Sequence, residues 1–138
     1  MDILLAYDGS DPADHALRVA VEQFDPDRVT ALYVFAPGEA GYDTRLPFGT
    51  DRELEELASE RASELLSEIE QLLPERVTVR TVHEIGDPAR EIVSYAETHE
   101  VDHIVLGSHG REGVSRLLLG SVAEKVVRRS PAPVTVVR

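Results

Sequence analysis

The residues best suited to bind a ligand lie in one glycine-rich segment near the end of the chain, residues 107–122. Gly107 and Gly110 carry no Cβ atom, so backbone N–H groups there could approach a ligand closely. Gly120 and Ser121 are expected to open a helix, whose first N–H groups are free and lie at the positive end of the helix dipole. The pattern predicts a phosphate site. Tight turns that only connect elements are the alternative that these residues leave open.

Other kinds of site fit the sequence less well. A Walker A loop needs a lysine before its last hydroxyl residue, and none precedes Ser121; the dinucleotide fingerprint needs several glycines after the first strand, where only Gly9 occurs. Of the five histidines, only His99 and His103 are four residues apart, and they are expected to straddle a helix–strand turn, so we expect no metal site. No serine has an evident His–Asp relay, which argues against a hydrolase triad.

Short apolar runs typical of strands alternate with longer stretches of helical periodicity, and this pattern determines the expected fold. The order β-α-β-α-β-α-β-α-β predicts an open five-stranded parallel sheet with helices on both faces, Rossmann-like, in a single domain. The expected strands are 3–7, 29–35, 77–83, 103–107 and 134–137, and the expected helices are 12–24, 51–73, 88–96 and 117–129.

Turn residues indicate where helices begin. Asp11 is expected to cap the first helix with Pro12 at its first position, and Asp87 with Pro88 repeats the pattern. Residues 36–50 are rich in Gly and Pro and long for a connection, as in functional lids. Ligands of such folds bind outside the carboxyl ends of the strands, where we expect Asp8 and Gly107.

The charge and composition exclude several classes of function. With 26 acidic and 14 basic residues and a net charge of -12, we expect no binding to nucleic acid or to an anionic membrane. No run approaches the ~20 apolar residues of a membrane span, and no cysteine is present for disulfides, thiolate zinc or nucleophilic catalysis. We therefore expect a cytoplasmic domain.

The basic residues carry a further signal, because 13 of the 14 are Arg and only Lys125 is Lys. An acidic, lysine-poor surface is suited to concentrated salt, where repulsion among carboxylates is screened. We interpret this as a halophilic adaptation. An ordinary acidic cytosolic protein is the alternative.

The spacing Gly107-x2-Gly110-x9-Gly120-Ser121 resembles the nucleotide-binding motif of the universal stress protein family, in its ATP-binding branch. The resemblance extends through the opening residues 3–10, the Gly86-Asp87-Pro88 turn and the closing residues 131–137. It implies one universal stress protein domain over residues 1–138, with a fold like that of the adenine nucleotide alpha hydrolases.

The resemblance also implies a ligand, ATP carried with Mg²⁺, and the parts of the chain that hold it. Backbone groups of the glycine turn would line the triphosphate and ribose, and the helix start would hold phosphate. A carboxylate after the first strand would lie beside the ribose or a phosphate-bound Mg²⁺, and a valine on the second strand would contact adenine through its backbone. In chain order, the implied site residues are Ala6, Asp8, Val34, Gly107, His109, Gly110, Arg111, Gly120, Ser121 and Val122.

One of these positions departs from the family pattern. Relatives often carry Pro where this chain has Ala6; because a small residue is retained, little effect is expected.

The family's dimers, formed by antiparallel pairing of the final strands, imply a homodimer here. Val134, Val136 and Val137 fit that independently, because an uncovered apolar edge strand would be an aggregation risk.

The expected function is that of a non-catalytic, nucleotide-dependent regulator in a stress response, with residues 36–50 changing order on binding. A slow ATP hydrolase or nucleotidyl-transfer enzyme is one alternative. Against it, the sequence shows no Walker-type lysine and no water-positioning carboxylate other than Asp8. An interaction module that binds no nucleotide is the other alternative, and the intact glycine motif argues against it.

Overall fold

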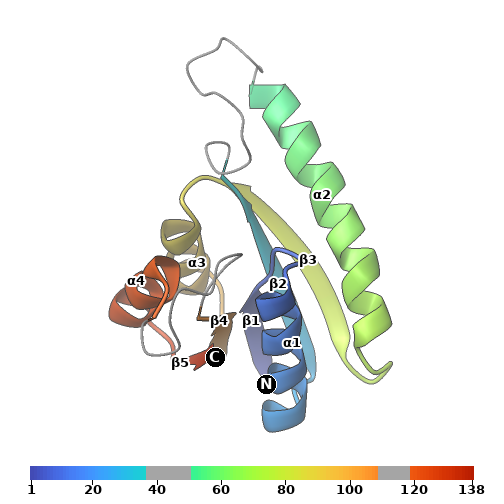
Figure 1. The fold of residues 1–138 in the computed structure, drawn as a ribbon, viewed down its shortest axis with the longest axis vertical. Coiled ribbons are helices and arrows are strands. Elements are labelled where there is room, and N and C mark those ends of the chain that lie inside the picture. The colour runs from blue at the N-terminus through green and yellow to red at the C-terminus, as the bar shows by residue number, and fades with distance from the viewer. Residues whose placement is uncertain (37–50, 109–118) are drawn as a thin grey trace.

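A computed structural model describes residues 1–36, 51–108 and 119–138 of the chain (Figure 1). The elements follow the expected alternation of strands and helices. In chain order they are β1 (Asp2–Ala6), α1 (Asp11–Phe24), β2 (Arg28–Phe35), α2 (Asp51–Leu72), β3 (Thr78–Ile85), α3 (Pro88–Thr98), β4 (His103–Gly107), α4 (Ser121–Arg129) and β5 (Val134–Val137).

The five described strands form one parallel sheet in the order β3-β2-β1-β4-β5, which confirms the predicted fold class. β1 is central and pairs with β2 on one side and β4 on the other. From β1 the chain proceeds through α1 to β2 and β3, whereas from β4 it proceeds through α4 to β5 on the opposite side. The direction of winding therefore reverses between β1 and β4.

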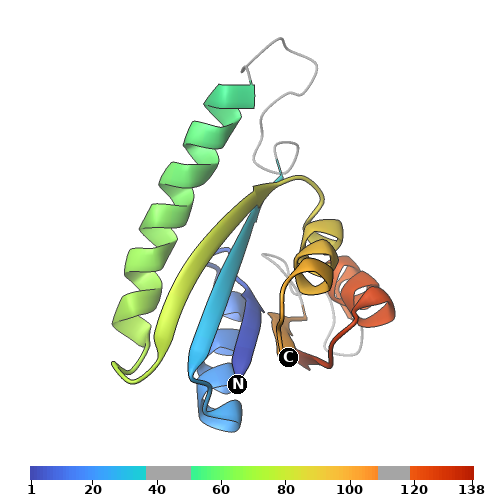
Figure 2. The same ribbon diagram turned by 180° about the vertical axis from the view of Figure 1, so that it is seen from behind.

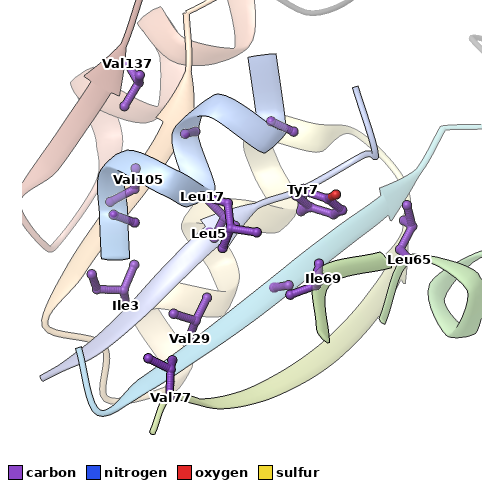
Figure 3. Packing of buried hydrophobic residues seen from close by; sticks show 14 residues of the cluster. Ile3, Leu5, Tyr7, Leu17, Val29, Leu65, Ile69, Val77, Val105 and Val137 are labelled. Carbon is purple, nitrogen blue, oxygen red and sulfur yellow. The ribbon is translucent and has the colours of Figure 1, made fainter. Parts of the chain in front are cut away.

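The helices cover the two faces of the sheet in pairs, α1 and α2 on one face and α3 and α4 on the other (Figures 1 and 2). Alternation along β1 shows this directly. Ile3 and Leu5 belong to a cluster with buried residues of α1 and α2, whereas Leu4 belongs to a cluster with buried residues of α3 and α4. All three side chains are fully buried, as expected of a central strand covered on both faces. Ile3 and Leu5 are shown in Figure 3.

Helix α2 is the longest of the described helices, with 22 residues, and it packs along β3 and β2. Its buried positions Ala58, Leu65 and Ile69 recur at helical spacing, and its many glutamates are exposed. Leu65 and Ile69 lie against the same cluster as Tyr7 and Leu5 (Figure 3). Its acidic side is therefore a solvated surface.

The start of α1 differs by one residue from the expectation. Ser10, and not Asp11, is the N-cap, because its Oγ accepts a hydrogen bond from the N–H of Ala13 at 3.3 Å. Asp11 and Pro12 then occupy the first two helical positions. The expectation for the third helix is confirmed, since Asp87 caps it and Pro88 opens it.

Other boundaries shift by a residue or two. β1 ends at Ala6 and not at residue 7, and β3 begins at Thr78 and continues to Ile85. Among the described residues, α4 begins at Ser121, and residues 117 and 118 of the expected helix lie outside them. No helix in the described ranges is long and apolar enough to cross a membrane.

Candidate functional site

The carboxyl ends of β1 and β4 lie side by side at the point where the winding of the sheet reverses. An open α/β sheet leaves a crevice at this point, because the two adjacent connections lead to opposite faces. Asp8 lies two residues beyond the end of β1, and Gly107 is the last residue of β4. The structure thus places both residues at the edge expected from the sequence.

The start of α4 is attached to the end of β4 by backbone hydrogen bonds. The N–H of Gly120 donates to the carbonyl oxygen of Ser108 at 2.6 Å, and the N–H of Ser108 donates to that of Val137 at 2.8 Å. Ser108 is buried, with 7% of its surface exposed. The helix start is therefore held at the carboxyl edge of the sheet, beside β4 and β5.

At this position α4 presents backbone donors. Gly120 is the N-cap, and its carbonyl accepts the first intrahelical hydrogen bond, from the N–H of Glu124 at 2.9 Å. The N–H groups of Ser121, Val122 and Ala123 consequently have no acceptor within the helix. Ser121 is exposed and adds a hydroxyl group. Together with the helix dipole, these donors could hold an anion.

Gly107 has a structural reason to be glycine. A Cβ atom at this position would lie 3.2 Å from the Cβ of Pro12 and 3.3 Å from its carbonyl oxygen. The start of α1 thus occupies the space beside Gly107. The sequence interpretation attributed this glycine to a ligand, whereas the structure shows that packing against α1 by itself leaves little room for a Cβ atom.

Asp8 combines a local role with a free acceptor. Its Oδ1 accepts a hydrogen bond from the N–H of Ser10 at 2.9 Å, so it stabilises the turn before α1. The side chain is exposed, and its Oδ2 has no hydrogen bond to a described residue. The turn is held by α2, because Gly9 has a φ of +80° and its missing Cβ would lie 2.7 Å from Cδ2 of Leu65.

Three further predicted positions share the face covered by α3 and α4. Ala6, Val34 and Val122 are partly buried and pack at the border of the same hydrophobic cluster. Ala6 ends β1, Val34 lies near the end of β2, and Val122 is in the first turn of α4. The structure therefore brings these three positions to one side of the sheet. His109, Gly110 and Arg111 lie outside the described residues.

Tyr7, which the sequence analysis did not single out, supports the turn beside Asp8. Its hydroxyl donates a hydrogen bond to Oδ1 of Asp14 in α1. Burial, and then this hydrogen bond, raise the pKa of Tyr7 well above its usual value. Tyr7 is therefore a neutral donor at physiological pH and could not act as a base. The sequence does indicate that Tyr7 is buried, because it ends the apolar run of the first expected strand.

The described residues at this edge can be compared with the groups that catalytic and metal sites need. In the described part of the chain, no serine hydroxyl is hydrogen-bonded to a histidine, and no group of His, Asp and Glu could hold a metal ion. Between β1 and α4, the described residues offer the backbone N–H donors of the α4 start, the exposed hydroxyl of Ser121 and the Oδ2 of Asp8. These groups suit a phosphorylated ligand that could bring its own cation.

The fold and this edge define a Rossmann-like α/β protein with a helix start presented at the switch point of the sheet. The chain belongs to the universal stress protein family, whose model matches residues 1–138. Universal stress protein MJ0531 of Methanocaldococcus jannaschii is 39% identical to it over 99% of this chain and 81% of the relative. The structure of universal stress protein UspA from Lactobacillus plantarum superimposes with a TM-score of 0.76 at 32% identity, covering 100% of this chain and 97% of that one.

Two less similar structures share the fold and contain a nucleotide. A universal stress protein in complex with cAMP is 21% identical with a TM-score of 0.63, covering 100% of this chain and 97% of that chain. A family member from Arabidopsis thaliana with AMP bound is 13% identical with the same score, covering 99% and 90%. At these identities the likeness concerns the fold alone.

Proposed function

We propose that the chain binds ATP with Mg²⁺ at the carboxyl edge between β1 and β4, and acts as a non-catalytic, nucleotide-dependent regulator. The observation that carries the proposal is the start of α4, held at this edge by the hydrogen bond from Gly120 to Ser108 and presenting free N–H groups. Such a start is suited to phosphate even in a protein whose net charge is -12.

The phosphates would lie against the first turn of α4. There the N–H groups of Ser121 and Val122 and the hydroxyl of Ser121 would donate hydrogen bonds, with Gly120 allowing close approach. The residues of the preceding glycine turn, His109, Gly110 and Arg111, keep their predicted role at the triphosphate and ribose. Gly107 would border the site next to α1, whose residue Pro12 occupies the space beside it.

The other end of the nucleotide would follow the face of the sheet that carries Ala6 and Val34. Both are partly buried at the border of one apolar cluster, so adenine could continue that apolar surface and bond to the backbone near Val34. Asp8 would contribute its free Oδ2 to the ribose or to a Mg²⁺ on the phosphates, because carboxylate oxygen is a ligand that Mg²⁺ favours. Bound Mg²⁺ would neutralise part of the phosphate charge.

The non-catalytic role is inferred from the groups that the described residues bring to this edge. Among them, the carboxyl edge offers no general base beside the proposed phosphates other than Asp8, and Tyr7 is kept protonated by burial. Sustained ATP turnover that disappears in Asp8→Asn would overturn this part of the proposal in favour of a slow hydrolase.

Calorimetric titration of ATP·Mg²⁺ into nucleotide-free protein in molar KCl tests the site. Ser121→Glu places a negative charge at the helix start, where it suits the helix but repels phosphate, so at least tenfold weaker binding is expected. Val127→Glu, at a 47% exposed position farther along α4, changes the charge equally and should bind as the parent does. Gly110→Val should also lose binding, because its side chain would block close backbone approach.

The outcomes separate the competing functions. Absence of binding in the parent, checked by equilibrium dialysis, would refute the nucleotide proposal and favour an interaction module. Equal binding in the parent and in Ser121→Glu would place the phosphates elsewhere.

We also propose a homodimer through β5. The carbonyl oxygens of Pro133 and Val137 accept hydrogen bonds from the N–H groups of Ile104 and Ser108, on the side of β4. Because backbone groups alternate in direction along a strand, those of Val134 and Val136 point toward the open edge of the sheet. The side chains of Val134 and Val136 are only partly buried, whereas Val137 is buried within its own chain. Val137 would therefore support the strand and not the contact between subunits.

Light scattering after size-exclusion chromatography tests the dimer. Val136→Pro removes an N–H that β4 does not use, and should yield a folded monomer. A parent that is monomeric at all concentrations, or a Val136→Pro variant that remains dimeric, would contradict this assembly.

The predicted cytoplasmic location and the salt adaptation remain proposals based on composition. Thermal unfolding tests the second. If the carboxylate-rich surface is adapted to salt, the Tm should rise from about 0.1 M to molar KCl, where the Debye length falls from ~10 to ~3 Å. An unchanged Tm would indicate an ordinary acidic protein.

A further inference from the structure

A second concave site lies at the opposite edge of the sheet. A cavity of about 540 Å³ is bordered by the starts of β1 and β2, by β3, and by the end of α3 with the residues that follow it. Asp2 lines it at the start of β1, whereas Ala6 ends that strand at the nucleotide edge. At a rise of ~3.3 Å per residue, the two edges are ~13 Å apart along β1. A ligand here would thus not overlap the proposed nucleotide.

One wall of this cavity carries two arginines on neighbouring strands. Arg80 of β3 is paired in register with Thr30 of β2, and Arg28 lies two residues before Thr30, so both arginines are on the face toward α3. Nη2 of Arg80 donates a hydrogen bond to the hydroxyl oxygen of Tyr95 at 2.7 Å. No carboxylate of the described residues forms an ion pair with Arg80, and the guanidinium keeps further donors.

Three carboxylates also line the cavity, those of Asp2, Glu100 and Asp102. They come from the start of β1 and from the connection between α3 and β4. Oδ2 of Asp102 accepts the N–H of Asp2 at 2.7 Å, which fixes its position, while Glu100 is exposed. Asp2 is paired in register with Arg28, and its Oδ2 lies 3.6 Å from Nη1 of Arg28, whereas Glu100 and Asp102 precede β4 on the far side of β1 and form the other wall.

The part of the cavity beneath α3 is ordered by an aromatic pair. Tyr95 stacks on His99 with ring centroids 3.8 Å apart and planes at 7°. Tyr95 is buried and its hydroxyl positions Arg80, and Thr30 is buried with 1% of its surface exposed. The charged groups are therefore mounted on fixed elements, and much of the remaining lining is polar.

We propose that this cavity binds a free α-amino acid with a neutral polar side chain. The ligand carboxylate would bond to Arg80 and Arg28, and its ammonium would lie among the carboxylates of Glu100 and Asp102. An anion alone would face three carboxylates and a cation alone two guanidinium groups, whereas a zwitterion with its charges at opposite ends is complementary to both walls. The exposed polar lining, which includes Thr98 and His99, favours a side chain that can form hydrogen bonds.

Calorimetry with L-glutamine, L-asparagine, L-serine and L-threonine tests the proposal on the intact chain. At least one should bind in the millimolar range or more tightly. For L-glutamine, the matched analogues are 4-carbamoylbutanoic acid, which lacks the ammonium, and 4-aminobutanamide, which lacks the carboxylate. The same pair would be built for whichever amino acid binds, and each analogue should bind at least tenfold more weakly.

Variants locate the ligand. Arg80→Ala should weaken binding about tenfold or more, and Glu100→Gln severalfold, while both leave ATP·Mg²⁺ binding unchanged. Arg18→Ala removes an exposed arginine from α1, on the other face of the sheet, and should bind the amino acid as the parent does. Arg80 and Arg18 are both exposed, so each variant should melt near the Tm of the parent. Measuring the Tm therefore checks that a loss of binding is not a loss of folding.

Two results would overturn the proposal. One is the absence of binding by all four amino acids, which would mean that the charged walls only neutralise each other. The other is equal binding by an analogue that lacks one charge. Neither depends on the nucleotide site, because the readout is direct binding of the amino acid.

Discussion

The two edges of the sheet differ in what they are made of. At the carboxyl edge, the groups available for binding belong mainly to the backbone: the free N–H groups of α4 and the turn around Gly9, with the Oδ2 of Asp8 as an exception. At the amino edge they belong to side chains, above all Arg28 and Arg80 facing a group of carboxylates. The proposed nucleotide site thus depends mainly on the folded backbone, and the proposed amino-acid site depends on side chains placed upon it.

This difference determines how each edge responds to mutation. A backbone site depends on close packing, because its glycines lie within van der Waals contact of α1 and α2. Substitutions there should reduce the free energy of unfolding as well as binding. A site of exposed side chains can lose a charged group with little effect on folding. Four predictions test this contrast, in order of decreasing effect.

The largest effect is expected at Gly9. With φ at +80° and the Cδ2 of Leu65 2.7 Å from the position of a Cβ atom, Gly9→Val combines backbone strain with a clash against α2. The free energy of unfolding should fall by about 3 kcal/mol, measured by urea denaturation. Asp8→Asn, which keeps the oxygen that caps the turn, is the matched control and should stay near the parent. A Gly9→Val variant as stable as the parent would show that α2 does not restrict this turn.

A smaller loss is expected at Gly107. The Cβ atom in Gly107→Ala would press on the backbone of Pro12, which a side-chain rotation cannot relieve. We expect a loss of about 2 kcal/mol from the strain, again by urea denaturation. If Gly107→Ala were as stable as the parent but bound nucleotide more weakly, the glycine would be needed for the ligand and not for packing.

Next comes the cap of α3, which also begins at the carboxyl edge. Oδ2 of Asp87 accepts the N–H of Arg90 at 3.0 Å, so Asp87→Ala should cost about 1 kcal/mol, read from the shift in Tm. Asp87→Asn keeps an acceptor oxygen and should recover most of the loss. Equal losses in both variants would assign the effect to charge and not to the cap.

The smallest effect concerns pH, at the amino end of β4. Burial lowers the pKa of His103, whose Nε2 lies 2.6 Å from Oγ1 of Thr135 and whose ring contacts Phe24. The unfolded chain therefore binds the proton more readily, and this contribution to stability is present above about pH 6.5 and is lost as the pH falls toward the lowered pKa. Between about pH 7.5 and 5.5 the parent should lose more stability than His103→Gln in urea denaturation. Parallel losses would show that other groups dominate the acid response.

Much of the fold followed from local sequence. Strict apolar runs defined β1 and β4, and the Asp87-Pro88 pair located the start of α3, because these signals act over a few residues. The cap of α1 was displaced by one residue, since Ser10 and Asp11 are both good caps and only the reach of the Ser10 hydroxyl to Ala13 decides between them.

For the candidate site, the sequence located the motif but not its neighbours. The spacing of Gly107, Gly120 and Ser121 identified the segment, and Asp8 followed from its place after a strand. That Pro12 fills the space beside Gly107 could not be read from the sequence, because the contact joins residues nearly a hundred positions apart.

By itself, the sequence determined the order of strands and helices, the glycine motif and the acidic, lysine-poor surface, because each of these is a property of composition or short-range spacing. Only the tertiary structure decided that β1 lies between β2 and β4, that Gly120 bonds to Ser108, and that Arg28 and Arg80 line one cavity with Glu100 and Asp102. Register and packing between distant elements set these contacts, since a strand's partners and the face of each side chain depend on the whole sheet.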